Sequence, residues 1–290
     1  MLEGPEERLT KRPVPFVKWA GGKGQLLQDF EKYFPPEFGT YYEPFLGGGA
    51  VFFHLLSKKR IRKAVISDLN KDLINCYVAI RDHIDELLQQ LRRLQRHAKD
   101  KDFYYNKARK RFNEINLNTG LEGNIEKAAL LIYLNKTCYN GLYRVNKKGE
   151  FNVPWGRYKN PNIYDEENLL AINRVLRLKD IVISCDDYQQ VVKNAGKGDF
   201  IYLDPPYQPI SPTANFTEYT SESFTIADQQ RLAEVFRQLS SRGCMVMLSN
   251  SPKVYDLYNG YTIVKVNATR AISCVGSRRG PVEELLIMSY

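Results

Sequence analysis

The stretch from residue 41 to residue 68 constrains the fold of this chain more than any other. A short strand pattern at 41–46 leads into three consecutive glycines at 47–49, and a helical pattern follows at 51–57. A second strand pattern then ends at Asp68, about 20 residues after the glycines. This order is typical of a Rossmann-type sheet, in which the acid binds the ribose hydroxyls of an adenosine-containing cofactor. The alternative is a structural turn with Asp68 as a helix cap.

Five more segments have the composition of strands, and helical patterns separate most of them. We therefore expect an α/β fold with a mostly parallel sheet. The glycine spacing departs from G-x-G-x-x-G, which argues against a pyrophosphate-binding dinucleotide fold. The region from residue 70 to about residue 136 is helical and charged, and it separates the second strand from the third. The five predicted strands are residues 181–188, 200–203, 244–249, 261–266 and 284–288.

Another glycine-containing segment, residues 15–25, precedes the first predicted strand. It leads into an amphipathic helix that Pro35 and Pro36 end. Glycines ahead of a helix let backbone N–H groups approach an anion or a carboxylate. The segment is not a P-loop, because Gly24 stands where such a loop needs Ser or Thr. The apolar face of the predicted helix consists of Leu26, Leu27, Phe30 and Phe34.

The predicted strand at 200–203 stops at the sequence Asp-Pro-Pro-Tyr, residues 204–207. Two consecutive prolines end a strand and stiffen the turn, and the residue before a proline is restricted in conformation. Such a turn can present the Asp204 carboxylate, backbone carbonyls and the Tyr207 ring at the carboxyl end of a strand. Ligands of open α/β sheets bind at that edge. Taken alone, these four residues fit an ordinary strand end equally well.

Aromatic and basic side chains gather between residues 137 and 158, around a predicted hairpin. Residues 144–146 and 151–153 flank a Lys-Lys-Gly turn. Arginine can read guanine edges with two hydrogen bonds, and aromatic rings or prolines can wedge between base steps. The formal net charge of +9 also favours a polyanionic partner such as nucleic acid. The alternatives are a structural hairpin and a basic surface that only keeps the protein in solution.

Several other classes of protein do not fit the composition. The five cysteines are scattered and the three histidines lie in helix-like sequence, so we expect no disulfide framework, no metal site and no histidine-based hydrolase. Residues 1–13 have the composition of a disordered, charged tail, without the apolar core of a signal peptide. Since no apolar run reaches bilayer length, we expect no membrane partner and a cytoplasmic location.

Four of these motifs occur in an order known from one family. Residues 18–23 (Lys-Trp-Ala-Gly-Gly-Lys), residues 43–49 (Glu-Pro-Phe-Leu-Gly-Gly-Gly), the hairpin region 140–158 and the Asp-Pro-Pro-Tyr turn together resemble the Dam-type DNA adenine-N6 methyltransferases. The resemblance implies a Rossmann-like class I methyltransferase sheet with an antiparallel strand near the C-terminus. It also implies an inserted helical target-recognition domain that carries the hairpin. The implied boundaries are 1–13 for the tail, 14–69 and 165–290 for the methyltransferase domain, and 70–164 for the target-recognition domain.

The resemblance also implies ligands and site residues. Members of the family use S-adenosyl-L-methionine and commonly methylate the adenine of GATC in double-stranded DNA. Trp155 stands where we would expect phenylalanine, and the neighbouring Tyr158 is a candidate for base wedging. The implied cofactor-binding residues are Trp19, Lys23, Phe45, Gly47, Asp68, Asp187 and Asp204. The implied DNA-binding residues are Lys18, Tyr139, Asn140, Arg144, Pro154, Arg157 and Tyr158.

The implied catalytic residues are Asp204, Pro205 and Tyr207. A base paired inside a duplex cannot reach a buried methyl donor, so it must be flipped out. Tyr207 would stack on the flipped adenine, while the Asp204 carboxylate and the Pro205 carbonyl would accept hydrogen bonds from its exocyclic amine. Because the methyl donor is already activated, positioning and electrostatics can supply catalysis without a covalent intermediate.

Three other interpretations are open from the sequence. The chain could methylate cytosine N4 in DNA, it could methylate adenine in RNA, or it could bind DNA without catalysis. Asp rather than Ser at position 204 favours adenine, and the hairpin favours duplex DNA. All the positions implied to be catalytic carry the expected residues, which favours an enzyme over a DNA-binding protein without catalysis. A cognate restriction endonuclease would be its functional partner if the enzyme belongs to a restriction system.

Overall fold

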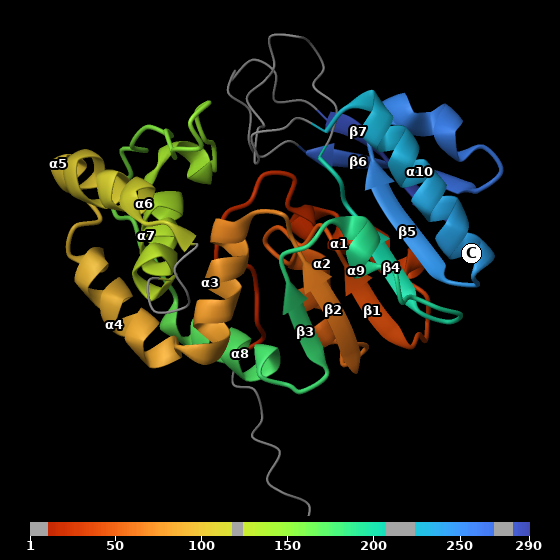
Figure 1. Ribbon diagram of the computed structural model, residues 1–290, viewed down its shortest axis with the longest axis horizontal. Coiled ribbons are helices and arrows are strands. Elements are labelled where there is room, and N and C mark those ends of the chain that lie inside the picture. The colour runs from red at the N-terminus through yellow and green to blue at the C-terminus, as the bar shows by residue number, and fades with distance from the viewer. Residues whose placement is uncertain (1–10, 118–123, 207–223, 270–280) are drawn as a thin grey trace, which may run out of the picture.

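The computed structural model describes residues 11–117, 124–206, 224–269 and 281–290, and a single sheet forms its centre (Figure 1). Among these residues the sheet has seven strands in the order β3-β2-β1-β4-β5-β7-β6. Neighbours from β3 to β5 are parallel, whereas β7 runs antiparallel to β5 and β6. The predicted fold class is therefore confirmed. The strands are β1 (Thr40–Glu43), β2 (Lys63–Ser67), β3 (Ile181–Ser184), β4 (Phe200–Leu203), β5 (Met245–Asn250), β6 (Thr262–Thr269) and β7 (Pro281–Met288).

Successive side chains of the strands alternate between the two faces of the sheet. Tyr202 and Leu286 lie in the core on one face, together with residues of α1 and α2. Ile201 and Leu203 lie in the core on the other face, together with residues of α9 and α10. Both faces are thus covered, as is usual for parallel sheets. The covering helices are α1 (Leu27–Phe30), α2 (Ala50–Ser57), α9 (Tyr188–Val191) and α10 (Ile226–Ser241).

The segment before β1 differs from the expected structure. The sequence predicts one amphipathic helix, but the chain forms three short helical pieces, η1 (Lys23–Gln25), α1 and η2 (Glu31–Tyr33). Glycines precede the segment and two prolines follow it, which leaves too few good helix formers for a cooperative helix. Leu27 is only partly buried, whereas the other three residues of the expected apolar face are buried. The Lys23 side chain, which lies in η1, is also buried.

Between β2 and β3 the chain forms a group of helices, most of which lie to the left of the sheet in Figure 1. Every residue from 128 to 135 of α7 is buried. A helix buried on all sides lies inside a core. The segment 116–124, which its two glycines predict to be a loop, falls partly outside the described residues. The helices are α3 (Lys71–Asp82), α4 (Ile84–Gln95), α5 (Lys101–Phe103), the π-helical turn η3 (Tyr104–Arg109), α6 (Lys110–Glu114), α7 (Asn124–Thr137) and α8 (Glu166–Leu176).

The predicted hairpin is a closed loop, residues 138–158, rather than a pair of strands. Two isolated antiparallel bridges join Val145 to Phe151 and Cys138 to Trp155. The Asn146 side chain accepts the backbone N–H groups of Lys148 in the Lys-Lys-Gly turn and of Glu150 after it, at 2.9 and 3.0 Å. Phe151 is buried and packs edge-on against Phe112 of α6, with the ring centroids 5.8 Å apart. Side chains therefore anchor the loop on the helical core, in addition to its two short antiparallel bridges.

Within the parts of the chain listed above, none of the helices is both long enough and apolar enough to cross a membrane.

Candidate functional site

Polar side chains replace apolar ones at the edge of the sheet where the parallel strands end. Glu43 ends β1, and Asp204 directly follows β4, each two residues after a buried tyrosine. Ser249 lies near the end of β5, and Glu284 lies in the antiparallel neighbour β7. Side chains two residues apart in a strand share a face. All four polar groups therefore lie on the face of the sheet that α1 and α2 cover.

Lys23 lies between two of these carboxylates. Its Nζ atom is 2.7 Å from Asp204 Oδ1 and 3.6 Å from Glu284 Oε1. Nζ also donates a hydrogen bond to the Gly21 carbonyl at 2.9 Å, and the Ser249 hydroxyl donates to Glu284. The Lys23 side chain is only 4% exposed, and an unpaired charge at that depth would be strongly unfavourable. The buried ammonium and its two carboxylates therefore form one electrostatic unit.

Burial controls the charge states at this edge of the sheet. It raises the pKa of Asp204 to about 6, while Lys23 acts to lower that pKa and Glu284 adds to the rise. Burial also raises the pKa of Glu43 to about 8, against the effect of the hydrogen bond that the Tyr41 hydroxyl donates to it at 2.8 Å. At neutral pH, Asp204 is therefore a carboxylate and Glu43 an uncharged acid.

Two buried amides hold the turn after β4 from the opposite face of the sheet. Gln229 of α10 donates from Nε2 to the Pro206 carbonyl at 3.4 Å. Asn250 of β5 donates from Nδ2 to Gln229 Oε1 at 2.9 Å, and both amide side chains are at most 1% exposed. The turn that begins at Asp204 is thus fixed from both faces. Tyr207, the predicted stacking residue, lies outside the described residues.

The glycine turn after β1 leaves no room for a side chain. Gly47 has a φ of +50°, and a Cβ atom there would lie 2.8 Å from the Trp19 ring. The Gly47 N–H donates to Asp68 Oδ2 at 2.9 Å, and Asp68 Oδ1 accepts the Asn70 N–H at 2.9 Å. The helix cap of α3 is Asn70, so the interpretation of Asp68 as that cap is wrong. Asp68 instead joins the end of β2 to the glycine turn, and each of its oxygens can accept a further hydrogen bond.

Phe45 and Asp187 lie near the same edge, after β1 and β3. The Phe45 ring stacks against Tyr188 with the centroids 5.4 Å apart. Asp187 accepts the Gln189 N–H at 3.0 Å and caps α9. Asp187 therefore has a structural role that the sequence did not predict, and Phe45 contributes an aromatic side chain near this edge of the sheet.

Trp19 connects this edge of the sheet to the loop 138–158. Its ring centroid lies 5.5 Å from that of Tyr143 in the loop. The Tyr143 hydroxyl donates to Asp72 of α3 at 2.7 Å, and Lys127 of α7 lies 3.2 Å from the same carboxylate. The glycine-turn region, two helices and the loop therefore meet through a short chain of contacts.

Asn135 of α7 makes a second connection between the same regions. Its Oδ1 accepts the Lys18 N–H at 2.8 Å. Its Nδ2 donates to the carbonyls of Lys18 and Gly141, at 2.8 and 2.9 Å. The side chain is 1% exposed, and these bonds use both of its N–H donors and one lone pair of its oxygen. The only signal in the sequence was a polar residue within an apolar helical run.

The structure brings the predicted DNA-binding residues together on the loop 138–158 and beside it. Lys18 Nζ lies over the Tyr158 ring, 4.7 Å from its centroid. Arg144 Nε donates to Asn152 Oδ1 at 2.7 Å, which fixes its guanidinium along the loop. Asn140 and Arg157 both have left-handed backbone conformations, with φ of +55° and +56°. The members with exposed side chains are Lys18, Tyr139, Pro154 and Arg157.

Four buried polar residues of the site were not predicted from the sequence. Ser249 and Glu284 support Lys23 and Asp204 on one face, and Gln229 and Asn250 hold the turn from the other. Their strands and helix were predicted, but a strand buried on both faces has no alternation of apolar and polar residues to show where a polar side chain points.

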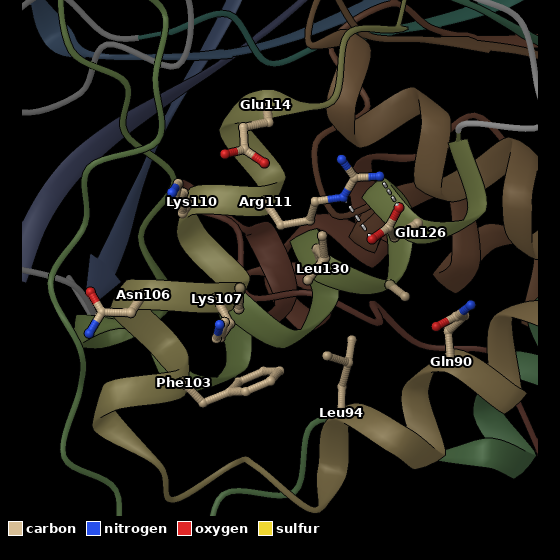
Figure 2. A pocket seen from close by; sticks show the side chains of 12 residues that line it. Gln90, Leu94, Phe103, Asn106, Lys107, Lys110, Arg111, Glu114, Glu126 and Leu130 are labelled. Carbon is tan, nitrogen blue, oxygen red and sulfur yellow. Dashed lines mark hydrogen bonds and ion pairs between the residues drawn. The ribbon is translucent and has the colours of Figure 1, made fainter.

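A cavity of about 430 Å³ lies away from these residues, among α4, η3, α6 and α7 (Figure 2). Arg111 and Glu126 form an ion pair of 2.8 Å at its wall, which is drawn with dashed lines in Figure 2. None of the predicted site residues lines this cavity. In the described part of the chain, no group of three or more His, Cys, Asp or Glu side chains is arranged to hold a metal ion.

Comparison with known proteins places the chain in a family. Residues 19–272 match the D12 class N6 adenine-specific DNA methyltransferases. Because this match covers most of the chain, the protein belongs to that family and is an adenine-specific DNA methyltransferase. The assignment favours adenine in DNA over the cytosine, RNA and non-catalytic interpretations.

Relatives with similar lengths support the same conclusion. The chain is 47% identical to the Type II methyltransferase M.MjaIII of Methanocaldococcus jannaschii, over 95% of this chain and 99% of the relative. It is 43% identical to the Type II methyltransferase M1.LlaDCHI of Lactococcus lactis subsp. cremoris, over 95% of each. It is 37% identical to the DNA adenine methylase of Serratia marcescens, over 96% of this chain and 99% of the relative. The resemblance to the Dam-type enzymes is therefore confirmed.

Proposed function

We propose that the protein transfers a methyl group from S-adenosyl-L-methionine to the N6 amine of an adenine that is flipped out of duplex DNA, within the sequence GATC. The family membership described above supplies the reaction class. The methyl donor, the target sequence and the roles of individual residues are the proposal.

The residues at the carboxyl ends of β1, β2 and β4 fit this cofactor. Gly47 exposes backbone where a side chain would collide with Trp19, and Asp68 is the acid at the end of the neighbouring strand that meets ribose hydroxyls in such folds. Phe45 offers an aromatic ring for the adenine, and Asp187 keeps lone pairs for the same end of the cofactor. S-adenosylmethionine would supply a methyl group carried on a positively charged sulfur.

Asp204 would orient the target amine. Its side chain is 18% exposed, so it is still accessible from outside while Lys23 holds Oδ1. The carboxylate and the Pro205 carbonyl would accept the two N6 hydrogens, which directs the nitrogen lone pair toward the methyl group. Lys23 was predicted to contact the cofactor, but its contacts with Asp204 and Glu284 favour a supporting role for its ammonium. Tyr207 remains the proposed stacking partner of the base.

The loop 138–158 and the surrounding helices, within residues 70–164, would form the target-recognition domain. Arg144 is the proposed reader of a guanine edge, because its guanidinium is held in place by Asn152. The exposed Tyr139 and the basic Arg157 would contact the duplex beside it. Lys18, Asn140, Pro154 and Tyr158 complete the proposed contact surface.

The observation that carries the proposal is the Lys23–Asp204 pair at the carboxyl end of β4. We expect Asp204→Ala to lower the single-turnover rate of methyl transfer by at least about 100-fold, because the acceptor of the amine hydrogens is lost. DNA binding should be retained. Transfer of tritiated methyl groups and a DNA-binding titration measure the two properties. A variant that still methylates at the wild-type rate would refute the role of Asp204.

The target sequence is tested in cells. Two relatives are named Type II methyltransferases, which supports a restriction endonuclease as a functional partner.

DNA from cells that express the chain should carry N6-methyladenine at GATC, detected by methylation-sensitive sequencing. Cells with the Asp204→Ala variant are the control. Methylation confined to another sequence would refute GATC but leave the reaction itself intact.

A further inference from the structure

Glu284 has no role in the function proposed above, yet it lies within the site. It is 5% exposed, its Oε1 is 3.6 Å from Lys23 Nζ, and it accepts a hydrogen bond from the Ser249 hydroxyl. Burying a carboxylate is unfavourable unless it is paired, and a paired buried carboxylate is weak evidence for stability alone. The placement of Glu284 beside the catalytic turn therefore needs a functional explanation.

We propose that Glu284 is a positioning residue of the methyltransferase, which fixes the Lys23 ammonium so that Lys23 orients the Asp204 carboxylate toward the target amine. This inference rests on the proposed role of Asp204. Glu284 belongs to β7, next to β5, and on the other side of β5 lies β4, which carries Asp204. Glu284 is therefore two strands away from the turn that begins at Asp204, and it contacts Lys23. We do not expect it to contact the target base.

The geometry at Lys23 supports this arrangement. A lysine side chain has four flexible methylenes and three N–H donors, so a single partner would not fix its ammonium group. Asp204 Oδ1 and the Gly21 carbonyl accept hydrogen bonds at 2.7 and 2.9 Å, and Glu284 Oε1 forms an ion pair at 3.6 Å. The three groups come from different segments of the chain. Ser249 holds Glu284 in turn. Loss of the Glu284 carboxylate would leave the Lys23 ammonium less well fixed. The Asp204 carboxylate, which Lys23 orients, could then adopt more than one orientation.

The same arrangement makes a prediction about charge. The groups that face Asp204 are Lys23 of η1, Glu284 of β7 and Glu43 of β1, and Glu43 is uncharged at neutral pH because its pKa is about 8. Glu284 adds to the rise in the pKa of Asp204, and Lys23 opposes it. Removal of the Glu284 charge therefore favours the ionised form of Asp204 and lowers its pKa.

The experiment measures single-turnover methyl transfer from preformed enzyme, S-adenosylmethionine and a duplex that carries the sequence methylated in cells. Rates are measured from pH 5 to pH 9 for the wild type, Glu284→Gln, Glu284→Asp and Glu283→Gln. We expect Glu284→Gln to lower the plateau rate by about 10- to 100-fold, because misplacement of a reacting group has effects of that size. The acid limb of its profile should also move to lower pH, and the KM for DNA should stay within about twofold of the wild-type value, because binding does not use Glu284.

The other variants separate positioning from folding. Glu283 is the next residue in the strand, but it forms an exposed pair with Lys265 at 3.0 Å, so Glu283→Gln should match the wild type in rate and profile. Glu284→Asp keeps the charge on a shorter side chain, so its acid limb should stay near that of the wild type while its rate falls. If Glu284→Gln does not fold, Ser249→Ala is used in its place. Loss of the hydroxyl that holds Glu284 should lower the rate of methyl transfer without changing the KM for DNA.

The outcomes are distinct from those that test the proposed function. A wild-type rate and acid limb in Glu284→Gln would overturn the inference, and so would a slower rate with an unchanged acid limb, which a structural role alone predicts. In the event that Ser249→Ala is the only folded variant, a wild-type rate would overturn it. By contrast, full activity of Asp204→Ala would refute the proposed function itself.

Discussion

Lys23 carries a buried positive charge that two carboxylates share, and a third acid lies close by. At neutral pH the third acid, Glu43, is protonated, whereas Asp204 is ionised. Asp204 and Glu284 both face the single ammonium of Lys23, so acidic groups are in excess over the positive charge at this edge. This excess suits a methyl donor whose reacting sulfur is positive. The protonation of Glu43 therefore prevents a larger accumulation of negative charge at the same edge.

The charge state of Glu43 makes folding stability depend on pH. Its pKa rises from 4.5 in the unfolded chain to about 8 in the folded protein. Between these two values the folded state binds more protons than the unfolded state, so stability falls as pH rises through this window. We expect Glu43→Gln to remove this loss and to lower the difference in unfolding free energy between pH 5 and pH 8 by at least about 1 kcal/mol.

Urea unfolding at pH 5, 6.5 and 8 measures the effect. Glu37→Gln is a matched control, because Glu37 is an exposed glutamate before the same strand. The control should retain the pH dependence of the wild type. A Glu43→Gln variant with that same dependence would show that Glu43 is ionised in the folded protein.

The residues at the ends of the strands could be predicted from the sequence, but the buried polar residues that hold them in place could not. Asp204, Gly47 and Asp68 follow predicted strands, so their place at one edge of the sheet was expected. Glu284 could not be assigned, because it precedes an apolar run that is buried on both faces and has an exposed glutamate as its neighbour. Asp187 was expected to contact ligand, but its short helix uses it as a cap.

Among the elements, α7 has the largest influence on the site. It lies inside the helical core, and Asn135 on this helix holds both Lys18 and the loop at Gly141. The sequence predicted the helix and the loop separately. It could not predict their connection, since the partners of Asn135 are 117 and 6 residues away and are backbone groups rather than side chains.

We expect Asn135→Leu to weaken sequence discrimination as well as stability. The change leaves the Lys18 N–H and two carbonyls unpaired in the interior, which costs about 1–3 kcal/mol for each unsatisfied group. The loop should then shift relative to the methylation site, so that rates on single-base variants of the preferred sequence approach the rate on that sequence. Methyl transfer on this set of duplexes gives the discrimination, and urea unfolding gives the stability.

Asn173→Leu is the control for this experiment. Asn173 is also a buried amide, but it donates to the carbonyls of Ile80 and Arg81 at 2.7 and 2.9 Å, at the end of α3. Its loss should reduce stability without changing discrimination. Equal loss of discrimination in both variants would mean that destabilisation, and not the position of the loop, is the cause.

For the whole molecule, charge governs the encounter with DNA. The formal net charge is +9, and the loop 138–158 carries Lys147 and Lys148 at its exposed turn. Phosphate contacts release counterions, so the logarithm of affinity falls linearly with the logarithm of salt concentration, by about 0.9 for each contact. We expect the double variant Lys147→Gln and Lys148→Gln to reduce this slope by about 1 to 2.

The control variant removes two exposed lysines at the other edge of the sheet. Lys58 follows the end of α2, and Lys63 begins β2, so both lie far along the strands from the site. Their replacement by Gln lowers the net charge by the same amount and should leave the slope nearly unchanged. Fluorescence anisotropy at 50 to 300 mM salt measures the slopes, and equal reductions in both variants would assign the effect to overall charge.

The hydrogen bonds of Asn135 also bear on how target specificity can be exchanged between enzymes of this kind. Because one amide fastens the loop at Gly141 and the backbone of Lys18 together, the loop is not an independent module. A loop transplanted from a relative would keep its contact residues but lose its alignment with the methylation site. A working exchange would have to move the loop, Asn135 with its helix and the segment around Lys18 together as one cassette.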